Sequence, residues 1–487
     1  MDNVRIAVDV GGTFTDIALE HAEGMTTKKV LTTPDKPEEG VLSGIKSTLT
    51  EANISPSEIK ILIHGTTLAT NALIERKGAK VALITTEGLR DSVEMAQENR
   101  FEQYDINIDR PKPLVPRYLR WGIRERMNVN GEVLIQLEDK SIEQLLPMID
   151  KNQIEAIAIG LIHSYANSMH EEKIAEHLSA ARPDLSITLS SQVCPEIREY
   201  ERQSTACANA YVQPLMSRYL TKLDEALQSM GFMCPFLLMT SGGGLTTLDT
   251  SIKFPVRLVE SGPAGGAILA TEIAKECGID NVLSFDMGGT TAKICLIDDY
   301  TPQMTRTFEV ARVYRNLKGS GLPLRIPAIE MVEIGAGGGS IAKVDEMKRI
   351  SVGPESSGAS PGPACYGQGG LDATVTDADV ILGRIDPKDF AGGAVKLAPE
   401  KADLVLQKAV GDQLSLDSSL SAFGVSEIVD ENMANAARVH AIEWGKDISA
   451  RSMIAFGGAA PLHALRLAEK LDINKVGSLK NIFRPPI

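Results

Sequence analysis

The chain has 487 residues, of which 43% are hydrophobic and 23% are charged, and its formal net charge is −14. This composition excludes a disordered chain and allows two or three domains with full cores. The acidic balance argues against nucleic acid or an anionic membrane as a partner, because both bind basic surfaces. The six cysteines lack metal-type spacing, and no leader or membrane span stands out, so we expect a cytoplasmic protein.

Short β-branched runs alternate with helical patterns in the first half of the chain, which predicts α/β layers. A long helix is expected over residues 198–230, interrupted near Gln213 and Pro214. The other expected elements are strands 5–10, 59–64, 80–85, 154–162 and 186–189, and helices 40–52 and 68–76.

The second half continues this alternation with strands expected over 236–239 and 282–285. A helix between them is expected to start at Pro263, a favoured first-turn residue, and to end at Gly278. Residues 335–370 are dense in Gly, Ser and Pro, which predicts a long functional loop region with short strands.

An internal repeat is the strongest signal in the sequence. Residues 8–19 read VDVGGTFTDIAL and residues 285–296 read FDMGGTTAKICL, so Asp, both glycines, Thr, Ile and Leu coincide. Because the copies lie 277 residues apart, they indicate a duplicated domain. Each copy reads as a strand, a tight glycine turn and a second strand.

The residue types of the repeat fit a phosphate site. Glycines let backbone N–H groups approach an anion, and threonine hydroxyls add donors. An aspartate before each turn is consistent with a Mg²⁺ ion. The aspartate would hold the ion directly or through water, and the ion would bridge to the phosphates. A plain hairpin turn is the alternative, and two matching copies weaken it. The motif GxxxxGK[ST] is absent, and no GxGxxG links a strand to a helix.

The order of these segments resembles the actin, heat-shock chaperone and sugar kinase superfamily. Residues 260–267, ESGPAGGA, look like its first connection between domains, and residues 456–461, FGGAAP, look like its adenosine-binding turn. Further motifs are similar to the hydantoinase A/5-oxoprolinase family, namely HGTTLATNA at 64–72, IGAGGGSIA at 334–342, VGPES at 352–356, PGPACYG at 361–367 and TVTDA at 374–378.

The resemblance implies two ribonuclease H-like α/β domains that face each other across a nucleotide cleft. We expect a first domain over 1–262 with an inserted subdomain, a second domain over 263–480, and a truncated second connection over 481–487. Members of the family continue beyond the adenosine turn, so the end at Ile487 predicts that the element closing the first domain is missing.

The resemblance further implies ATP-dependent hydrolysis of a cyclic amide such as a hydantoin, 5-oxoproline or a lactam. This chain would bind Mg·ATP and phosphorylate the substrate, and a hydantoinase B-like partner subunit would complete a hetero-oligomer. Asp9 and Asp286 are the expected catalytic and metal-binding pair. The expected nucleotide-binding residues are Gly11, Gly12, Thr13, Thr15, Gly288, Gly289, Thr290, Thr291, Gly337, Gly338, Gly457 and Gly458.

Two further residues are candidates for catalysis. Asp16 is a candidate for orienting the attacking oxygen, with a turn-capping residue as the alternative. His64 ends a predicted buried strand and is a candidate at the cleft, with a hydrogen-bonded structural histidine as the alternative. Glu333, before the glycine run, is open to a nucleotide or metal role and to a surface role.

Two other functions remain open. The same phosphate loops fit a carboxylase subunit of the acetone or acetophenone type. They also fit a non-catalytic ATP-driven switch of the chaperone kind. The elaborated loops over 335–377 favour the enzyme, because a simple switch needs no such wall.

Overall fold

The computed structural model describes residues 4–11, 14–33, 36–312, 318–358, 360–390 and 395–478, so the predicted second connection lies outside the described residues. The chain divides into two compact units. The first unit is Met1–Gly265 with Met304–Ala328, and the second unit is Gly266–Gln303 with Ile329–Ile487. The segment Met304–Ala328, expected in the second domain, therefore groups with the first unit. The domain limits derived from the resemblance stay a prediction.

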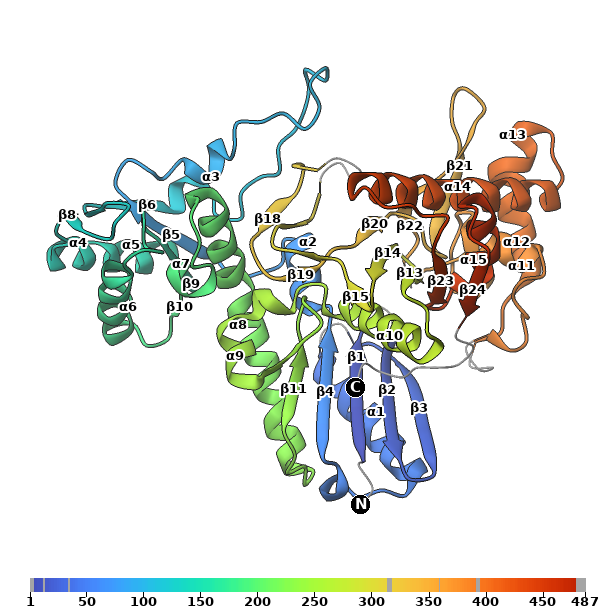
Figure 1. Ribbon diagram of the computed structural model, residues 1–487, viewed down its shortest axis with the longest axis horizontal. Coiled ribbons are helices and arrows are strands. Elements are labelled where there is room, and N and C mark those ends of the chain that lie inside the picture. Colours follow the sequence, from blue (N-terminus) through green and yellow to red (C-terminus); the bar gives the residue numbers. More distant parts are fainter. Residues whose placement is uncertain are drawn as a thin grey trace. The chain divides into compact units, whose positions relative to one another are not determined.

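The first repeat forms the middle of a six-stranded sheet in the first unit (Figure 1). Strand β1 pairs antiparallel with β2 and parallel with β4, and β4 pairs parallel with β11. Helix α1 (Pro37–Ala52) packs on β2 and β3, and α2 (Leu68–Ile74) follows β4. In spatial order the strands are β12 (Leu245–Thr247), β11 (Phe236–Met239), β4 (Ile61–Thr66), β1 (Arg5–Val10), β2 (Phe14–His21) and β3 (Gly24–Leu31).

The second repeat forms the middle of an equivalent sheet in the second unit. Here β13 pairs antiparallel with β14 and parallel with β23, which pairs parallel with β24. Helix α15 (Ala460–Lys470) follows β23 as α2 follows β4. The strands are β15 (Thr301–Pro302), β14 (Ala292–Asp298), β13 (Asn281–Met287), β23 (Ser452–Phe456) and β24 (Lys475–Ser478), and β20 (Val332–Ile334) also pairs with β14. The predicted α/β fold with a duplicated ribonuclease H-like domain is thus confirmed.

A second sheet of the first unit is inserted between α2 and β11. Its four strands are all parallel, in the order β10 (Ser186–Leu189), β9 (Ala156–Gly160), β5 (Val81–Thr86) and β6 (Arg120–Ile123). Every residue of β5 and β9 is buried, because helices cover both faces of a parallel sheet. The other elements of this insertion are α3 (Ser92–Met95), β7 (Arg126–Met127), β8 (Val133–Ile135), α4 (Asp139–Glu143), α5 (Leu145–Asn152), α6 (Met169–Ala181), α7 (Ser190–Val193) and α8 (Glu199–Ser229).

Helix α8 runs without a break through Pro214, so the expected interruption is wrong. A proline inside a helix costs about 3 kcal/mol, because it removes one hydrogen bond and crowds the preceding turn. The helix packs on β9 and β10, and its residues on both sides of Pro214 are buried. Gln213 also donates hydrogen bonds to the backbone of Ile252 and Lys253. Tertiary packing therefore outweighs the local preference.

The remaining elements complete both units. Helix α10 (Ser261–Cys277) begins two residues before the predicted Pro263. The glycine-rich region contains the hairpin of β21 (Ser340–Val344) and β22 (Ile350–Ser356), which confirms the predicted loop with short strands. The others are α9 (Leu248–Lys253), β16 (Met304–Thr305), β17 (Phe308–Val310), β18 (Leu322–Leu324), β19 (Ala328–Ile329), α11 (Val375–Ile381), α12 (Pro399–Leu406), α13 (Asp412–Leu414) and α14 (Ser418–Glu443). Among the described helices, none has the length and apolar character of a membrane span.

Candidate nucleotide-binding site

The two glycine turns have the same backbone geometry. Gly11 donates its N–H to the carbonyl of Phe14 at 2.9 Å, and Gly288 donates to the carbonyl of Thr291 at 3.1 Å. Each pair stands at the same position of the repeat, 277 residues apart. Each bond closes the tight turn between two antiparallel strands, as the sequence predicts. Gly12 and Thr13 lie outside the described residues.

The neighbouring parallel strand meets each turn in the same way. Thr67 donates its N–H to the carbonyl of Val10 at 3.0 Å, and Ala459 donates to the carbonyl of Met287 at 2.9 Å. Helices α2 and α15 start one residue later. Each unit therefore places the end of a second strand beside its glycine turn, and in the second unit this is the predicted adenosine turn.

Both aspartates of the repeat lie against a glycine of that neighbouring strand end. A Cβ atom at Gly65 would stand 2.7 Å from Oδ1 of Asp9, and one at Gly457 would clash with Oδ1 of Asp286. Gly457 also has a φ of +93°, which side chains rarely adopt. A side chain at Gly457 is therefore disfavoured for two reasons, whereas one at Gly65 requires the Asp9 side chain to move.

The glycine run over 335–339 packs against the second turn through backbone contacts. Gly338 donates its N–H to the carbonyl of Gly288 at 3.1 Å, and Gly339 donates to that of Gly289 at 2.6 Å. A Cβ atom at Gly337 would lie 2.5 Å from the carbonyl carbon of Thr290. By contrast, Cβ atoms at Gly289 and Gly458 would meet open space. The second unit thus brings together the predicted residues of three segments, with two glycines facing an open region.

Helix α11 holds this glycine run in place. Thr376 donates its hydroxyl to the carbonyl of Gly338 at 2.8 Å. The buried Asp377 accepts hydrogen bonds from the N–H groups of Thr374 and Cys365 at 3.0 and 2.8 Å. No supporting role was predicted for these residues, although Thr374 and Asp377 have the spacing of a capping box.

The charges around Asp286 come from the two adjacent strands. Lys293 is the cross-strand partner of Asp286, and Glu333 is the next partner of Lys293. The Lys293 ammonium lies 3.9 Å from the Glu333 carboxylate. Burial raises the pKa of Asp286 to about 6, and Lys293 opposes this shift. A cation bound at Asp286 would favour its ionised form.

The equivalent positions of the first unit have different charges. Asp16 lies opposite Asp9, and Lys29 lies opposite Asp16. The Lys29 ammonium forms an ion pair with Asp16 at 2.7 Å. Burial raises the pKa of Asp16, and Lys29 lowers it. Asp16 therefore shares a face with Asp9, but it is already bound to a lysine.

His64 is buried and has a partner that the sequence did not reveal. Its Nε2 lies 2.9 Å from the hydroxyl of Tyr219 on α8, 155 residues along the chain. Burial lowers the pKa of His64 to about 4, while a hydrogen bond with the backbone of Val8 raises it. This neutral, enclosed ring favours the structural alternative, and the catalytic role stays a prediction.

Thr15 is also fully buried. Its hydroxyl lies 3.1 Å from that of Thr32, which donates to the carbonyl of Gly11 at 3.0 Å. This geometry favours support of the turn. Thr291 is half-buried and Thr290 is exposed at the second turn.

Two residues of the first connection lie beside the first turn. They were not among the predicted site residues. Ser261 donates its hydroxyl to the carbonyl of Thr66 at 3.3 Å. A Cβ atom at Gly262 would lie 3.5 Å from Oδ1 of Asp9. The start of α10 therefore packs beside Asp9, and the small residues of the ESGPAGG segment were the signal for this close approach.

The residues present fit a nucleotide that is bound through its phosphates. Open glycines and backbone N–H groups around the second turn suit anionic oxygens. Within the described ranges, no group of three or more His, Cys, Asp or Glu side chains is arranged to hold a metal ion. A Mg²⁺ ion would therefore need phosphate and water oxygens in addition to a carboxylate, which is its usual preference.

Comparison with protein families agrees with this geometry. The model described as hydantoinase/oxoprolinase matches residues 202–481, and the one described as its N-terminal region matches residues 5–181. The chain belongs to the hydantoinase/oxoprolinase family. The matched ranges include both glycine turns and the glycine run of the second unit.

Curated relatives extend over nearly the whole chain. An uncharacterised protein of Methanocaldococcus jannaschii is 38% identical over 97% of this chain and 70% of its own length. Caprolactamase subunit alpha of Pseudomonas jessenii is 34% identical over 96% and 67%. Acetophenone carboxylase gamma subunit of Aromatoleum aromaticum is 32% identical over 96% and 65%. The chain thus spans about two thirds of the length of these three family members.

Two solved structures share the fold. ATP-dependent caprolactamase from Pseudomonas jessenii matches with a TM-score of 0.83 and 32% identity, over 97% of this chain and 68% of that chain. Nucleotide-free acetone carboxylase matches with a TM-score of 0.82 and 26% identity, over 98% and 68%. These structures come from two reaction classes of the family, an amidase and a carboxylase.

Proposed function

We propose that this chain is the ATP-binding, substrate-phosphorylating subunit of an enzyme that hydrolyses a cyclic amide. The observation that carries the proposal is the repeated turn, which has the same backbone hydrogen bond at Gly11 and Gly288 and an aspartate against a glycine in both units. The relative named caprolactamase supports an amide substrate. A hydantoinase B-like partner and a cytoplasmic location complete the proposal.

The proposed chemistry assigns separate roles to the residues of the two turns. Bound Mg·ATP would supply the phosphoryl group that activates the amide oxygen for ring opening. The backbone N–H group at Gly289 would bind a phosphate oxygen, and Lys293 would add positive charge nearby. Asp9 and Asp286 would serve as Mg²⁺ ligands, and Asp16 would orient the attacking oxygen after release from Lys29. Such positioning and charge neutralisation account for most of the catalysis of phosphoryl transfer.

A carboxylase subunit is the second candidate. Relatives and a solved structure named as acetophenone and acetone carboxylases favour it, because they match this chain over almost its full length. In that reaction the same turns would serve a different acceptor of the phosphoryl group. The loops that face the substrate would then decide between the two reactions.

Phosphate release from Mg·ATP by the purified chain tests the proposal. Caprolactam, hydantoin and 5-oxoproline form one arm, and acetone or acetophenone with bicarbonate forms the other. Stimulation by one cyclic amide is the expected result, and stimulation only in the ketone arm would assign the carboxylase reaction. A partner subunit is added to each arm if the chain alone binds ATP without turnover.

Variants of the two aspartates show whether both turns serve one reaction. Asp9→Ala and Asp286→Ala are each expected to lower the rate at least about a hundredfold, because each removes a ligand of the Mg²⁺ that neutralises the phosphates. Glu346→Ala is the matched control, since Glu346 is exposed on the β21–β22 hairpin. Full activity in either aspartate variant would contradict the shared role.

A further inference from the structure

The inserted part of the first unit contains a cavity that the proposed reaction does not use. Its volume is about 740 Å³, and its lining includes the loop after β5, Ile162 after β9, and the first residues of α8. It therefore lies at the carboxyl edge of a parallel sheet, where ligands of α/β proteins bind. Its size is within the roughly 300–1,000 Å³ of small-molecule sites.

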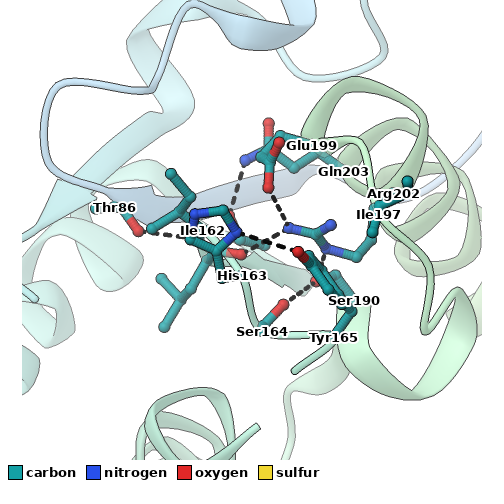
Figure 2. Close-up of polar contacts among 12 residues, drawn as sticks. Thr86, Ile162, His163, Ser164, Tyr165, Ser190, Ile197, Glu199, Arg202 and Gln203 are labelled. Carbon is teal, nitrogen blue, oxygen red and sulfur yellow. Dashed lines mark hydrogen bonds and ion pairs between the residues drawn. The ribbon is translucent and has the colours of Figure 1, made fainter. Parts of the chain in front are cut away.

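Polar side chains of α8 form hydrogen bonds with the strand ends next to this cavity (Figure 2). The fully buried Arg202 donates to the carbonyl of Leu161 at 2.9 Å and to the Glu199 carboxylate at 3.1 Å. Gln203 donates to the hydroxyl of Thr85 at 2.9 Å and to the carbonyl of Gly160 at 2.8 Å. The two side chains therefore join the ends of β5 and β9 to α8, whose first residues line the cavity.

The carboxylates that line the cavity are already bound to donors. Asp91 accepts two hydrogen bonds of 2.8 Å from Arg117. Glu199 is bound by Arg202, as described above. Glu201 accepts a hydrogen bond of 2.7 Å from Gln97 and lies 3.9 Å from Arg325. Their negative charge is therefore compensated within the protein.

Arg198 is the exception among the charged residues of the lining. Its side chain is exposed, and within the described part of the chain its guanidinium has no hydrogen-bond or ion-pair partner. Its backbone has a φ of +84° directly before α8, which is a strained conformation for a residue with a side chain. Ala96, on the opposite stretch of the lining, also has a positive φ of 55°. Such backbone strain is typical of binding sites.

We propose that this cavity binds a small organic monocarboxylate. Arg198 would bind the carboxylate, since a guanidinium suits this group in a two-point contact. Leu89, Met95 and Ile162 line the same cavity and would contact a short apolar chain. A polyphosphate does not fit, because the lining offers it a single uncompensated cation.

Calorimetric titration of the full chain with hexanoate and with its neutral isostere hexanamide tests the proposal. Hexanoate is expected to bind at least about tenfold more tightly, because only the carboxylate pairs with Arg198. Arg198→Gln is expected to remove this preference. Arg218→Gln is the matched control, since Arg218 is also exposed, lies on α8 and is outside the lining.

Two further measurements keep the outcome clear. Melting temperatures establish that the Arg198→Gln variant is folded. Asp9→Ala is expected to bind hexanoate as the wild type does, so the result is independent of the proposed reaction. The proposal is overturned if hexanoate does not bind at millimolar concentration, or if Arg198→Gln binds it with unchanged affinity.

Discussion

The two units share a strand arrangement but place opposite charges on it. In the first unit the order across three strands is Asp9, Asp16 and Lys29, and in the second it is Asp286, Lys293 and Glu333. A carboxylate thus faces the aspartate of the first turn, whereas an ammonium faces that of the second. We infer that the charge pattern of the duplicated frame has diverged between the two units.

Two buried histidines, one in each unit, also differ in charge. His64 is held neutral by burial, with a pKa of about 4. Burial also disfavours charge on His463, but hydrogen bonds with Asp379 at 3.2 Å and Asp430 at 2.7 Å outweigh it and raise its pKa to about 9. This His463 cluster joins α11, α14 and α15 of the second unit.

The largest expected effect comes from the glycines beside the two aspartates. Gly457→Ala combines a positive φ with a clash on Asp286, so we expect about 3 kcal/mol of lost stability and loss of ATP binding. Gly65→Ala is expected to cost less, because only the Asp9 side chain must move. Urea unfolding and calorimetry with ATP measure both effects.

Gly458→Ala is the control for this pair, since a Cβ atom there meets open space. A loss of stability as large in Gly458→Ala as in Gly457→Ala would contradict the role of the Asp286 contact.

The second prediction concerns the opposite pH dependence of the two units. The pKa of His64 lies below the unfolded value of 6.5, so its stabilisation is present above pH 6.5 and is lost as the pH falls towards 4. The pKa of His463 lies above that value, so its stabilisation is present below pH 6.5 and is lost as the pH rises through 9. Each contribution is about 3 kcal/mol.

The two tryptophans allow each unit to be followed separately. Trp121 lies in the first unit and Trp444 in the second. Fluorescence melting of Trp444→Phe and Trp121→Phe single-tryptophan chains is expected to show acid destabilisation of the first unit and alkaline destabilisation of the second. His463→Gln is the matched variant, and an unchanged alkaline loss in it would exclude the His463 cluster as the cause.

The third prediction tests the difference in charge between the positions of Lys293 and Lys29. Lys293→Met removes the cation that lowers the pKa of Asp286, so this pKa rises above about 6 and the acid limb of ATP turnover moves to higher pH. ATP affinity is expected to fall about tenfold, or 1.4 kcal/mol. Lys29→Met, the equivalent change in the first unit, is expected to leave the acid limb in place. Equal pH profiles of ATP turnover for both variants would contradict a difference in charge pattern between the two turns.

Much of the fold was predictable from the repeat. The motif at Asp9 and Asp286 correctly placed the central hairpin of both sheets, because glycine turns between β-branched runs have a strong local signal. Part of the candidate site was also predictable, since the predicted residues Gly288, Gly338 and Gly457 lie close together in the second unit. The carboxylate-to-glycine contacts that explain this meeting required the structure.

Other features depend on contacts that are distant in the sequence. Tyr219 reaches His64 over 155 residues, and no local pattern indicates such a pair. The pairing of Asp16 with Lys29 depends on the register of a third strand, which the motif does not contain. The expected break at Pro214 was wrong because burial of α8 outweighs the proline penalty.

The segment Met304–Ala328 has a consequence for how the protein is synthesised. The chain enters the second unit at Gly266, returns to the first unit at Met304, and leaves it again after Ala328. Strand β18 of this segment packs on α8, and the N–H of Arg325 donates to the hydroxyl of Thr205 at 2.9 Å. The first unit therefore cannot finish folding on the ribosome until residue 328 has emerged, by which time the β13–β14 hairpin of the second unit is already outside the exit tunnel.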